Sequence, residues 1–438
     1  MLEKDILYKK IRDKTAVIGV IGLGYVGLPL AVIAAKKGYK VIGVETQEAK
    51  VSKINQAVSY IDDINDEDLK MVVSCGYLKA AFDYEVLNNV DIVIICVPTP
   101  LDKYQYPDVS YIKKSAEEIG KRLNKGMLVV LESTTYPGTT EELLCPILQM
   151  NSGLVCKSDF YLAFSPERID PGNNIYRVNN IPKVVGGIDK ESAKLAAEFY
   201  RCIIDAAVHE VTSTKVAEMS KILENTYRNV NIGLINEMAI LCNKMEISIW
   251  EVIEAAKTKP YGFQAFYPGP GLGGHCIPLD PYYLAWKARE FGCPTKLIEM
   301  SGEINNYMPQ YIVERSAKIL NRFNKSLKSS KIVVLGIAYK NDISDYRESP
   351  SLKIINYFIK EGSEVKFNDP YIESYFYNGA KYNSSNMTSD LLSHADLVVI
   401  TTAHEKYDYD FIQKNSRYIF DTKNATKALE NKENIELL

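Results

Sequence analysis

The sequence predicts an α/β protein in which two doubly wound parallel-sheet domains are joined by an all-α middle domain built on a long helix. Strands alternate with helices near both ends of the chain, and the strand pattern stops between them. The chain has 438 residues, more than the roughly 250–300 that one hydrophobic core serves. We therefore expect three domains, at 1–205, 206–320 and 321–438.

The first domain opens with an apolar run at 15–22 that ends in glycine, which is typical of a buried parallel strand. A glycine-rich turn, a helical stretch closed by Gly38 and a second strand at 39–45 complete one βαβ unit. Further strands are expected at 90–97, 127–132 and 160–164.

The middle domain is predicted to be helical, because strand signals are absent from about 206 to 320. Apolar residues recur at helical spacing over 212–247, after a start rich in Ser and Thr. A second α/β pattern follows, with strands expected at 331–340, 363–369, 395–402 and 417–422. We expect the ligand cleft between the two sheets.

Charge and composition exclude several classes of protein. The formal net charge of −3 supplies no general attraction to nucleic acid or to an anionic membrane. No apolar run reaches the roughly 18–20 residues of a membrane span, and the charged N-terminus does not resemble a signal peptide, so we expect a cytoplasmic protein. Eight cysteines without a CxxC pair predict neither a metal site nor a disulfide framework.

The glycine-rich turn GLGYVG predicts a Rossmann-like dinucleotide site. Gly22 permits the tight turn, Gly24 lets a diphosphate approach the backbone, and Gly27 lets the helix pack on the sheet. The phosphates would then lie at the helix N-terminus, which favours anions. Tyr25 and Val26 complete the turn.

The end of the second strand predicts which dinucleotide binds. Glu45 lies at the offset where an acidic residue accepts hydrogen bonds from the adenosine ribose. No arginine follows it directly to hold a 2′-phosphate, so NAD is favoured over NADP.

The segment 268–284, PGPGLGGHCIPLDPYYL, predicts a nucleophile. Its glycines expose backbone N–H groups and let a ligand approach Cys276. An ordinary thiol has a pKa near 8.5, so this position needs a cation or hydrogen-bond donors to favour the thiolate. The neighbouring His275 is expected to have a positional role rather than to form a dyad with Cys276.

Several motifs of the chain resemble, in order, those of the UDP-glucose/UDP-mannuronate dehydrogenase family. They are GLGYVGLP, VPTP (97–100), EST (132–134), FSPER (164–168), KxxxN on the long helix, GGHCIPLD and LGIAYKNDISDYRESP (335–350). The resemblance covers about residues 15–425 and is greatest to the UDP-N-acetyl-D-glucosamine 6-dehydrogenases, with UDP-N-acetylmannosamine dehydrogenases as near neighbours.

The resemblance implies a four-electron oxidation of a C6 hydroxymethyl group in two NAD-dependent steps. Cys276 would capture the aldehyde as a thiohemiacetal and later carry a thioester that water hydrolyses. Lys221 and Asn225 are four residues apart, so one helix face presents a cation and an amide to one oxygen. By resemblance Asp280 orients the water, Thr134 lies near the nicotinamide, and Glu167 is a substrate-side carboxylate and candidate acid or base.

The resemblance also implies binding residues. The cofactor set is Gly22, Gly24, Tyr25, Val26, Gly27, Glu45, Lys50, Pro98, Thr99, Thr134 and Arg347. The substrate set is Glu167, Arg168, Lys221, Asn225, Lys259, Gly273, Gly274 and Lys340.

Two departures bear on the substrate. Pro171 stands where UDP-glucose enzymes carry a second glutamate, which argues against UDP-glucose and leaves open which group completes proton transfer. Lys259 stands near the position of an arginine that reaches a partner's substrate in those enzymes. The sequence favours UDP-N-acetylglucosamine for surface polysaccharide synthesis, with UDP-N-acetylmannosamine as the alternative.

Two other functions fit part of the pattern. A single-step dehydrogenase of the hydroxyacid type would share the layout but have no use for Cys276, and a non-catalytic sensor would lack the catalytic residues. By resemblance, and because the long helix offers an apolar face, we expect a homodimer or a larger homo-oligomer.

Overall fold

The computed structural model describes residues 2–61, 64–102, 104–170, 173, 175–274, 277–377 and 379–438. The chain forms two compact units, which are described one at a time. The first holds residues up to 224 together with 286–293, and the second holds 225–285 and 294–438. The boundary falls inside helix α8 (Thr214–Lys244), which confirms the single long helix predicted from the sequence.

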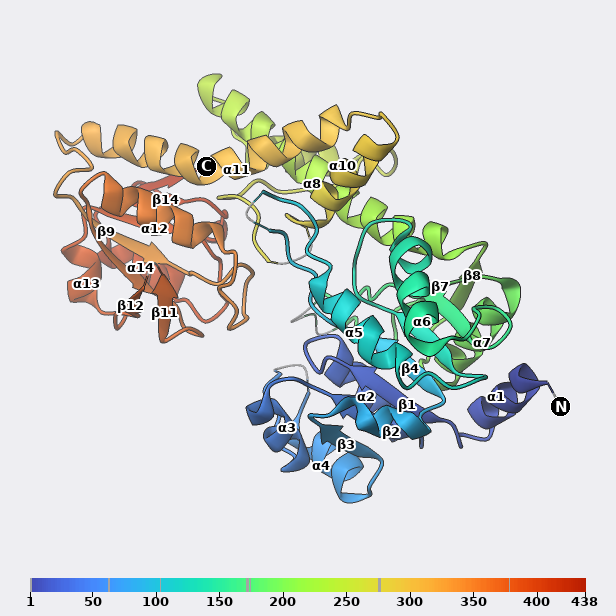
Figure 1. Cartoon of the computed structure of the whole chain (residues 1–438). Helices are drawn as coiled ribbons and strands as arrows, with labels where there is room; N and C mark the ends of the chain where they lie inside the picture. The colour runs from blue at the N-terminus through green and yellow to red at the C-terminus, as the bar shows by residue number, and fades with distance from the viewer. Residues whose placement is uncertain are drawn as a thin grey trace. The chain divides into compact units, whose positions relative to one another are not determined.

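The first unit is built on one eight-stranded sheet (Figure 1). Its strands are β1 (Val17–Ile21), β2 (Lys40–Val44), β3 (Leu78–Ala81), β4 (Ile92–Ile95), β5 (Leu128–Leu131), β6 (Tyr161–Phe164), β7 (Lys183–Gly187) and β8 (Val208–Val211). Their order is β3-β2-β1-β4-β5-β6-β7-β8, and the first six run parallel in the order of a dinucleotide-binding sheet. Strand β7 turns back antiparallel to β6.

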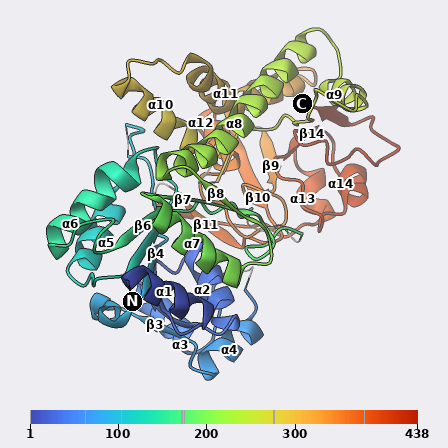
Figure 2. The ribbon, with the colours of Figure 1, turned by 90° about the vertical axis from the view of Figure 1, so that its right-hand side faces the viewer.

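Helices cover both faces of this sheet. They are α1 (Glu3–Arg12), α2 (Gly27–Lys36), α3 (Glu48–Asn55), α4 (Asp66–Ser74), η1 (Tyr84–Asn89), α5 (Ser110–Gly120), η2 (Thr140–Leu144), α6 (Cys145–Ser152) and α7 (Lys190–Ile203). Alternate residues of β4 enter opposite cores: Ile92 and Ile94 join the core of α1, α2 and α7, whereas Val93 and Ile95 join that of α5 and α6. Figure 2 shows α1 beside α7.

The second unit starts with helices and continues into a smaller sheet. Besides the rest of α8, the helices are α9 (Ile249–Lys257), α10 (Asp280–Glu290), α11 (Lys296–Asn321), α12 (Pro350–Lys360), α13 (Ser389–Ser393) and α14 (Tyr409–Asn415). Helix α10 crosses the unit boundary after Ala285. The strands are β9 (Lys331–Leu335), β10 (Glu364–Asn368), β13 (Leu397–Ile400), β14 (Ile419–Asp421) and β15 (Ile435–Leu437), with a hairpin of β11 (Ser374–Tyr377) and β12 (Ala380–Asn383).

The second sheet is also parallel and doubly wound. Its order is β10-β9-β13-β14-β15, and every pair is parallel. Val334 and Val399 pack toward α11 and α12, while Val333 and Val398 pack toward α13 and α14. The predicted fold class, two doubly wound parallel sheets linked by a long helix, is confirmed.

Strands β3, β7, β8 and β15 and the hairpin were not predicted. These strands are short, and several of them contain exposed polar residues, so no apolar run in the sequence identifies them. The expectation that strand signals end before 206 is wrong for β8, which pairs with β7 at 208–211. Among these strands, β7 has the largest consequence for the functional site. It runs antiparallel to β6, so its first residue lies at the edge of the sheet where β6 ends.

Candidate functional site

The glycine turn lies at the carboxyl end of β1, the edge at which doubly wound sheets bind ligands. Gly22 has φ +88°, which favours glycine, and a Cβ on Gly27 would lie 1.9 Å from the Gly22 carbonyl oxygen. A Cβ on Gly24 would meet nothing within 4 Å. The open backbone at Gly24 therefore fits the approach of a dinucleotide diphosphate.

Glu45 follows β2 at the same edge and is fixed against this turn. One oxygen of its buried carboxylate accepts the Leu23 N–H at 3.2 Å, and the other accepts the Gln47 N–H at 3.1 Å. The Lys50 ammonium lies 3.9 Å from the carboxylate. A carboxylate held here has the chemistry needed to accept hydrogen bonds from ribose hydroxyls.

The segments after β4 and β5 are tied together beside the turn. The Val97 N–H donates to the Ser133 hydroxyl at 2.9 Å, and the Thr99 hydroxyl donates to the Thr134 carbonyl at 2.7 Å. The structure thus brings Thr99 and Thr134, two of the predicted cofactor residues, together.

A buried charged cluster lies at the ends of β5, β6 and β7. The Lys183 ammonium is 2.8 Å from one Glu167 oxygen and 3.0 Å from a Glu132 oxygen. The other Glu167 oxygen accepts the N–H groups of Arg168 and Ile169 at 2.7 and 2.8 Å. The Tyr200 hydroxyl donates to Glu132. We call Glu132, Glu167, Lys183 and Tyr200 the charged cluster.

The pKa values of the two carboxylates in the charged cluster are shifted in opposite directions. Burial raises the pKa of both, and at Glu132 this effect wins. At Glu167 the Lys183 charge, its hydrogen bond and the backbone donor outweigh burial and hold the pKa below its ordinary value. Burial lowers the pKa of Lys183, but the two carboxylates more than reverse this, so Lys183 stays charged.

Helix α8 supplies Lys221 to the first unit's site and contacts a second predicted residue, Arg168, which follows β6. Lys221 is buried, and its charge also lowers the pKa of Glu167. Arg168 is engaged elsewhere: its guanidinium lies 2.7 Å from Glu224 and donates to the Pro182 carbonyl at 2.9 Å. The predicted contact of Arg168 with substrate would have to compete with these partners.

Glu218 connects α8 to the loop that carries Thr134. Its buried carboxylate accepts the Thr140 N–H at 2.9 Å and the Thr140 hydroxyl at 2.7 Å, and it also accepts the Gly138 N–H at 2.5 Å. Burial raises the pKa of Glu218 to about 7, although these donors act to lower it.

In the second unit, Asn225 and Asp280 form one pair. Both side chains are buried, and the Asn225 amide donates to the Asp280 carboxylate. Asp280 is the first residue of α10. The structure therefore brings together the predicted amide and the predicted water-orienting carboxylate.

Buried amides on α8 hold both sides of the glycine-rich loop. The Asn229 side chain donates to the Ile277 carbonyl at 3.1 Å, and the Asn236 oxygen accepts the Gly269 N–H at 3.0 Å. Asn305 of α11 completes the set, because it accepts from Asn236 at 2.9 Å and donates to the Asn229 carbonyl at 3.1 Å. We call Asn229, Asn236 and Asn305 the amide network. Cys276 and His275 lie outside the described residues, as does Pro171.

The predicted substrate residues Gly273 and Gly274 have a packing role. A Cβ on Gly273 would lie 2.7 Å from the Tyr339 Cβ, and one on Gly274 would lie 2.9 Å from the Tyr339 ring. Both glycines therefore contact the segment after β9 that carries Lys340.

The segment that carries Lys340 is held by a buried histidine. The Asp342 N–H donates to Nδ1 of His404 at 2.9 Å, which assigns the ring proton to Nε2, 3.1 Å from Asp369. The Asp369 carboxylate also accepts the Ile337 and Ala338 N–H groups.

Two predicted binding residues are exposed. The Arg347 guanidinium forms an ion pair with Asp345 at 2.7 Å, and the Lys259 ammonium lies 5.1 Å from the centroid of the Tyr261 ring.

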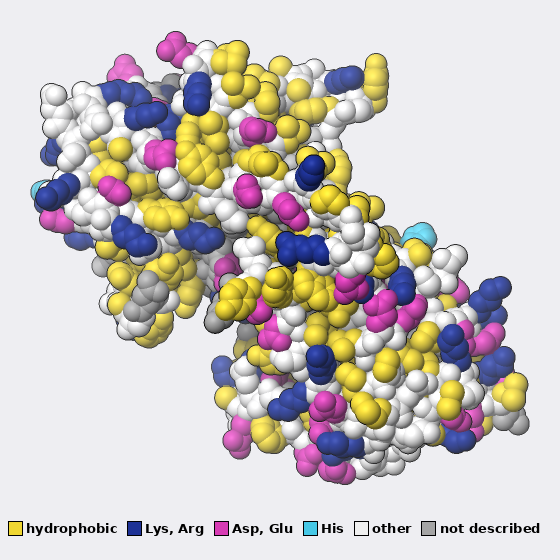
Figure 3. Space-filling model, turned by 45° about the horizontal axis from the view of Figure 1, so that its top comes forward, with side chains coloured by type: hydrophobic (Ala, Val, Ile, Leu, Met, Phe, Trp, Pro, Cys, Tyr) yellow, Lys and Arg dark blue, Asp and Glu magenta, His cyan; other side chains and the backbone are white. Residues whose placement is uncertain are grey.

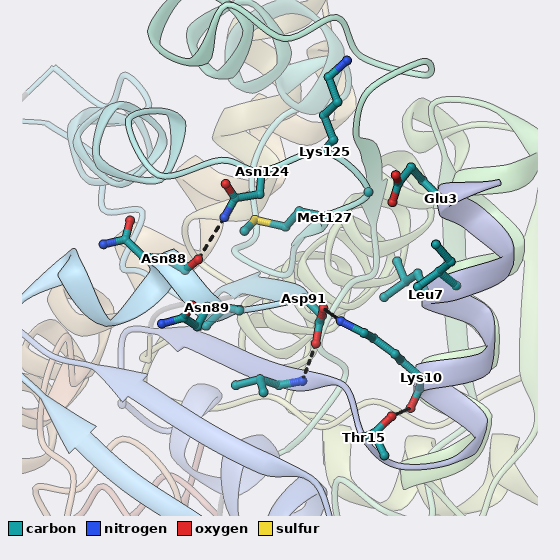
Figure 4. Close-up of a pocket in the computed structure, with 14 residues that line it drawn as sticks. Glu3, Leu7, Lys10, Thr15, Asn88, Asn89, Asp91, Asn124, Lys125 and Met127 are labelled. Atoms are coloured by element: carbon teal, nitrogen blue, oxygen red, sulfur yellow. Dashed lines mark hydrogen bonds and ion pairs between the residues drawn. The ribbon is translucent and has the colours of Figure 1, made fainter. Parts of the chain in front are cut away.

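A cavity of about 340 Å³ lies at the opposite edge of the first sheet, between α1 and the residues that precede β4 and β5 (Figure 4). Its Lys10 ammonium is 2.7 Å from Asp91, which also accepts the Val17 N–H at 2.9 Å. This edge holds the amino ends of the strands, whereas dinucleotides bind at the carboxyl ends. The cavity is therefore not the cofactor site.

Sequence reasoning missed Glu132, Lys183, Glu218 and the amide network. Glu132 belongs to the EST motif and directly follows an apolar strand, which was a usable signal. Lys183 carried no such signal, because a lysine before VVGG is typical of an exposed strand end. Only the reversed direction of β7 buries this side chain.

The open glycine turn with the acidic residue beside it, at the edge of a doubly wound sheet, is typical of an NAD-dependent enzyme. Three models of the UDP-glucose/GDP-mannose dehydrogenase family match the chain: the NAD binding domain at 16–204, the central domain at 215–307 and the UDP binding domain at 333–428. The chain belongs to this family. It is an NAD-dependent UDP-sugar dehydrogenase.

Individual relatives cover nearly the whole chain. CapL of Staphylococcus aureus is 37% identical over 420 residues, 94% of this chain and 97% of the relative. The UDP-N-acetyl-D-glucosamine 6-dehydrogenase of Pseudomonas aeruginosa is 36% identical over 392 residues, 89% of this chain and 91% of the relative. The solved UDP-D-ManNAc dehydrogenase of Pyrococcus horikoshii has a TM-score of 0.87 at 34% identity and covers 96% of this chain and 98% of its own.

Within the described ranges, no helix is long and apolar enough to cross a membrane, and no group of three or more His, Cys, Asp or Glu residues could hold a metal ion. On the face drawn in Figure 3, Lys and Arg side chains are scattered among acidic and hydrophobic ones rather than gathered into a stripe.

Proposed function

We propose that the chain oxidises the C6 hydroxymethyl group of a UDP-N-acetylhexosamine to a carboxylate, for surface polysaccharide synthesis. UDP-N-acetylglucosamine is the expected substrate and UDP-N-acetylmannosamine the alternative. Relatives named for each sugar are similar to this chain at 34–36% identity, so both sugars belong in the assay.

The observation that carries the proposal is the buried Asn225–Asp280 pair. Asp280 lies four residues after Cys276, and Asn225 lies one helical turn after Lys221. A cation and an amide on one helix face suit a developing alkoxide, and the carboxylate suits a water molecule.

In the proposed reaction each of two NAD⁺ molecules accepts one hydride from C6. The Cys276 thiolate adds to the aldehyde carbon, and the adduct is a thiohemiacetal; loss of the second hydride leaves a thioester. Water attacks the thioester carbon, the C–S bond breaks, and the carboxylate leaves while the thiol is restored. Lys221 and Asn225 stabilise the oxyanion, Asp280 orients the water, and Glu167 faces the sugar.

The test is NADH production with a panel of UDP-sugars and a Cys276→Ala variant. We expect two NADH per sugar for the wild type, and no acid from the variant although it still binds NAD. Normal turnover without the thiol, or one NADH per sugar, would leave the hydroxyacid-type alternative as the better description. Cys276→Ser is the matched control for the size of the side chain.

A pair of glycine variants tests the cofactor site. An added methyl at Gly24 meets no atom within 4 Å, so Gly24→Ala should fold normally but bind NAD about tenfold or more weakly. Gly27→Ala should instead lose stability, because its methyl would meet the Gly22 carbonyl. Unchanged NAD affinity in Gly24→Ala, measured by calorimetry, would contradict the expectation that the diphosphate binds at this turn. Tighter binding of NADP than of NAD would contradict the role given to Glu45.

We also propose a homodimer or larger homo-oligomer formed through α8. Exposed apolar side chains follow one face of this helix at spacings of three, four or seven residues: Val216, Met219, Leu223, Tyr227, Leu234 and Leu241. A stable active monomer in sedimentation would contradict this. The three domain boundaries and the cytoplasmic location stay predictions from the sequence.

A further inference from the structure

The charged cluster has an arrangement that the proposed reaction does not by itself explain. A catalytic acid or base needs a pKa near the working pH, so that it can both hold and release a proton. Glu167, the candidate for that role, is instead surrounded by donors. Three hydrogen bonds from the Arg168 and Ile169 N–H groups and from Lys183 occupy about three of the roughly four lone-pair positions of its carboxylate.

The donors of Glu167 select one protonation state. A backbone N–H or an ammonium donates only, so each of these bonds is lost or weakened when a proton is placed on the oxygen it uses. One lone-pair position remains, enough to accept a hydrogen bond from a substrate hydroxyl or a water molecule.

The Lys183 ammonium forms ion pairs with both carboxylates of the charged cluster, and the surroundings of each carboxylate determine which one stays ionised. Glu132 is fully buried and faces the Tyr200 hydroxyl and, at 3.9 Å, the Cys96 thiol. Burial raises the pKa of both carboxylates; at Glu132 burial outweighs the Lys183 charge, whereas at Glu167 Lys183, the backbone donor and Lys221 together outweigh burial. A proton entering the cluster therefore goes to Glu132, and Glu167 stays ionised.

We propose that Lys183 is a positioning residue that keeps Glu167 an ionised hydrogen-bond acceptor toward the sugar, so that Glu167 never serves as the general acid. Glu132 acts as the cluster's proton-holding partner, which allows one buried ammonium to sit between two carboxylates. The inference rests on the proposed function, because it deepens the part given there to Glu167.

The test compares variants that differ only in the ammonium. Lys183→Met alone would leave two buried carboxylates without a cation and could prevent folding. The double variant Glu132→Gln/Lys183→Met removes the ammonium together with the carboxyl group that holds the cluster's proton, and Glu132→Gln is its matched control. We expect Glu132→Gln to keep the wild-type acidic limb of kcat/KM, since the amide mimics a protonated Glu132. In the double variant that limb should move about one pH unit or more upward.

Lys183→Arg is the rescue variant, because arginine restores the cation, and its acidic limb should stay near that of the wild type. The proposal would be overturned if the acidic limb of kcat/KM fell at the same pH in Glu132→Gln and in the double variant. A limb that moves equally in both would also overturn it, since that would reflect packing rather than charge.

A second measurement does not depend on turnover. Carbon NMR of the cofactor-free chain, labelled at the glutamate carboxyl carbons, follows the Glu167 signal, which is assigned by its loss in Glu167→Gln. We expect that signal to titrate at higher pH in the double variant than in Glu132→Gln. If no UDP-sugar is oxidised by the wild type, the proposed function fails; if the NMR signal does not move, the role of Lys183 fails.

Discussion

The two units bury polar groups in different ways. The first places two carboxylates around one ammonium in the charged cluster, whereas the second fixes its loop with uncharged side chains in the amide network. A buried charge cluster sets protonation states but is costly to disturb, because removal of one member leaves an uncompensated charge. Buried amides fix backbone positions without any dependence on pH. The charged cluster thus controls ionisation, and the amide network controls geometry.

The largest effect is expected from the charged cluster. Lys183→Met should lower the free energy of unfolding by about 3–5 kcal/mol, because Glu132 and Glu167 remain buried without their cation. Urea unfolding at neutral pH measures it. The double variant with Glu132→Gln should recover part of the loss. A loss below about 1 kcal/mol would mean that the cluster behaves like a surface ion pair.

The amide network should give a smaller effect that does not depend on pH. Asn236→Ala leaves the buried Gly269 N–H without an acceptor and Asn305 without a donor, which should cost about 1–3 kcal/mol. Asn231→Ala is a matched control on the same helix, since the Asn231 amide donates only to the Tyr227 carbonyl at an exposed position. Equal losses in the two variants, or a loss that changes between pH 5 and 8, would contradict the contrast between the units.

Glu218 is intermediate between the two networks, because it is a single buried carboxylate that faces uncharged donors. Its pKa rises to about 7 on folding, so its contribution to stability is complete below about pH 4.5 and is lost as pH rises through 7. Relative to Glu218→Gln, the wild type should therefore lose about 2–3 kcal/mol between pH 5 and 8. Parallel stability curves for the two proteins would show that the donors fully offset burial.

The sequence predicted the features that local pattern determines. The glycine turn, the first βαβ unit and the long helix α8 follow from runs of residues that interact with near neighbours. The pairing of Thr99 with Thr134 was also accessible, because the carboxyl ends of neighbouring parallel strands share one edge of the sheet.

The charged cluster and the amide network could not be predicted in the same way. Lys183 and Glu167 meet only because β7 runs antiparallel to β6. Strand β7 is too short and too rich in glycine to be recognised as a strand from the sequence. Asn229 and Asn236 are seven residues apart on α8, a spacing that places them on one face, but asparagine on a helix face is usually exposed to solvent. Their burial depends on α11 and on the glycine-rich loop, which are distant in sequence.

The smallest effect should come from an exposed ion pair in the first unit. The Lys36 ammonium lies 2.7 Å from Asp68, with 39% and 38% of the two side chains exposed, whereas Lys183 lies 2.8 Å from Glu167 with 4% and 7% exposed. The two distances are nearly equal, so any difference in energy must come from the surroundings. Water screens the exposed pair and hydrates either partner alone, so Lys36→Ala should change the free energy of unfolding by about 0–0.5 kcal/mol, and less at high salt. Urea unfolding in low and high salt measures this, and a loss comparable to that of Lys183→Met would show that separation, not burial, sets the strength of these pairs.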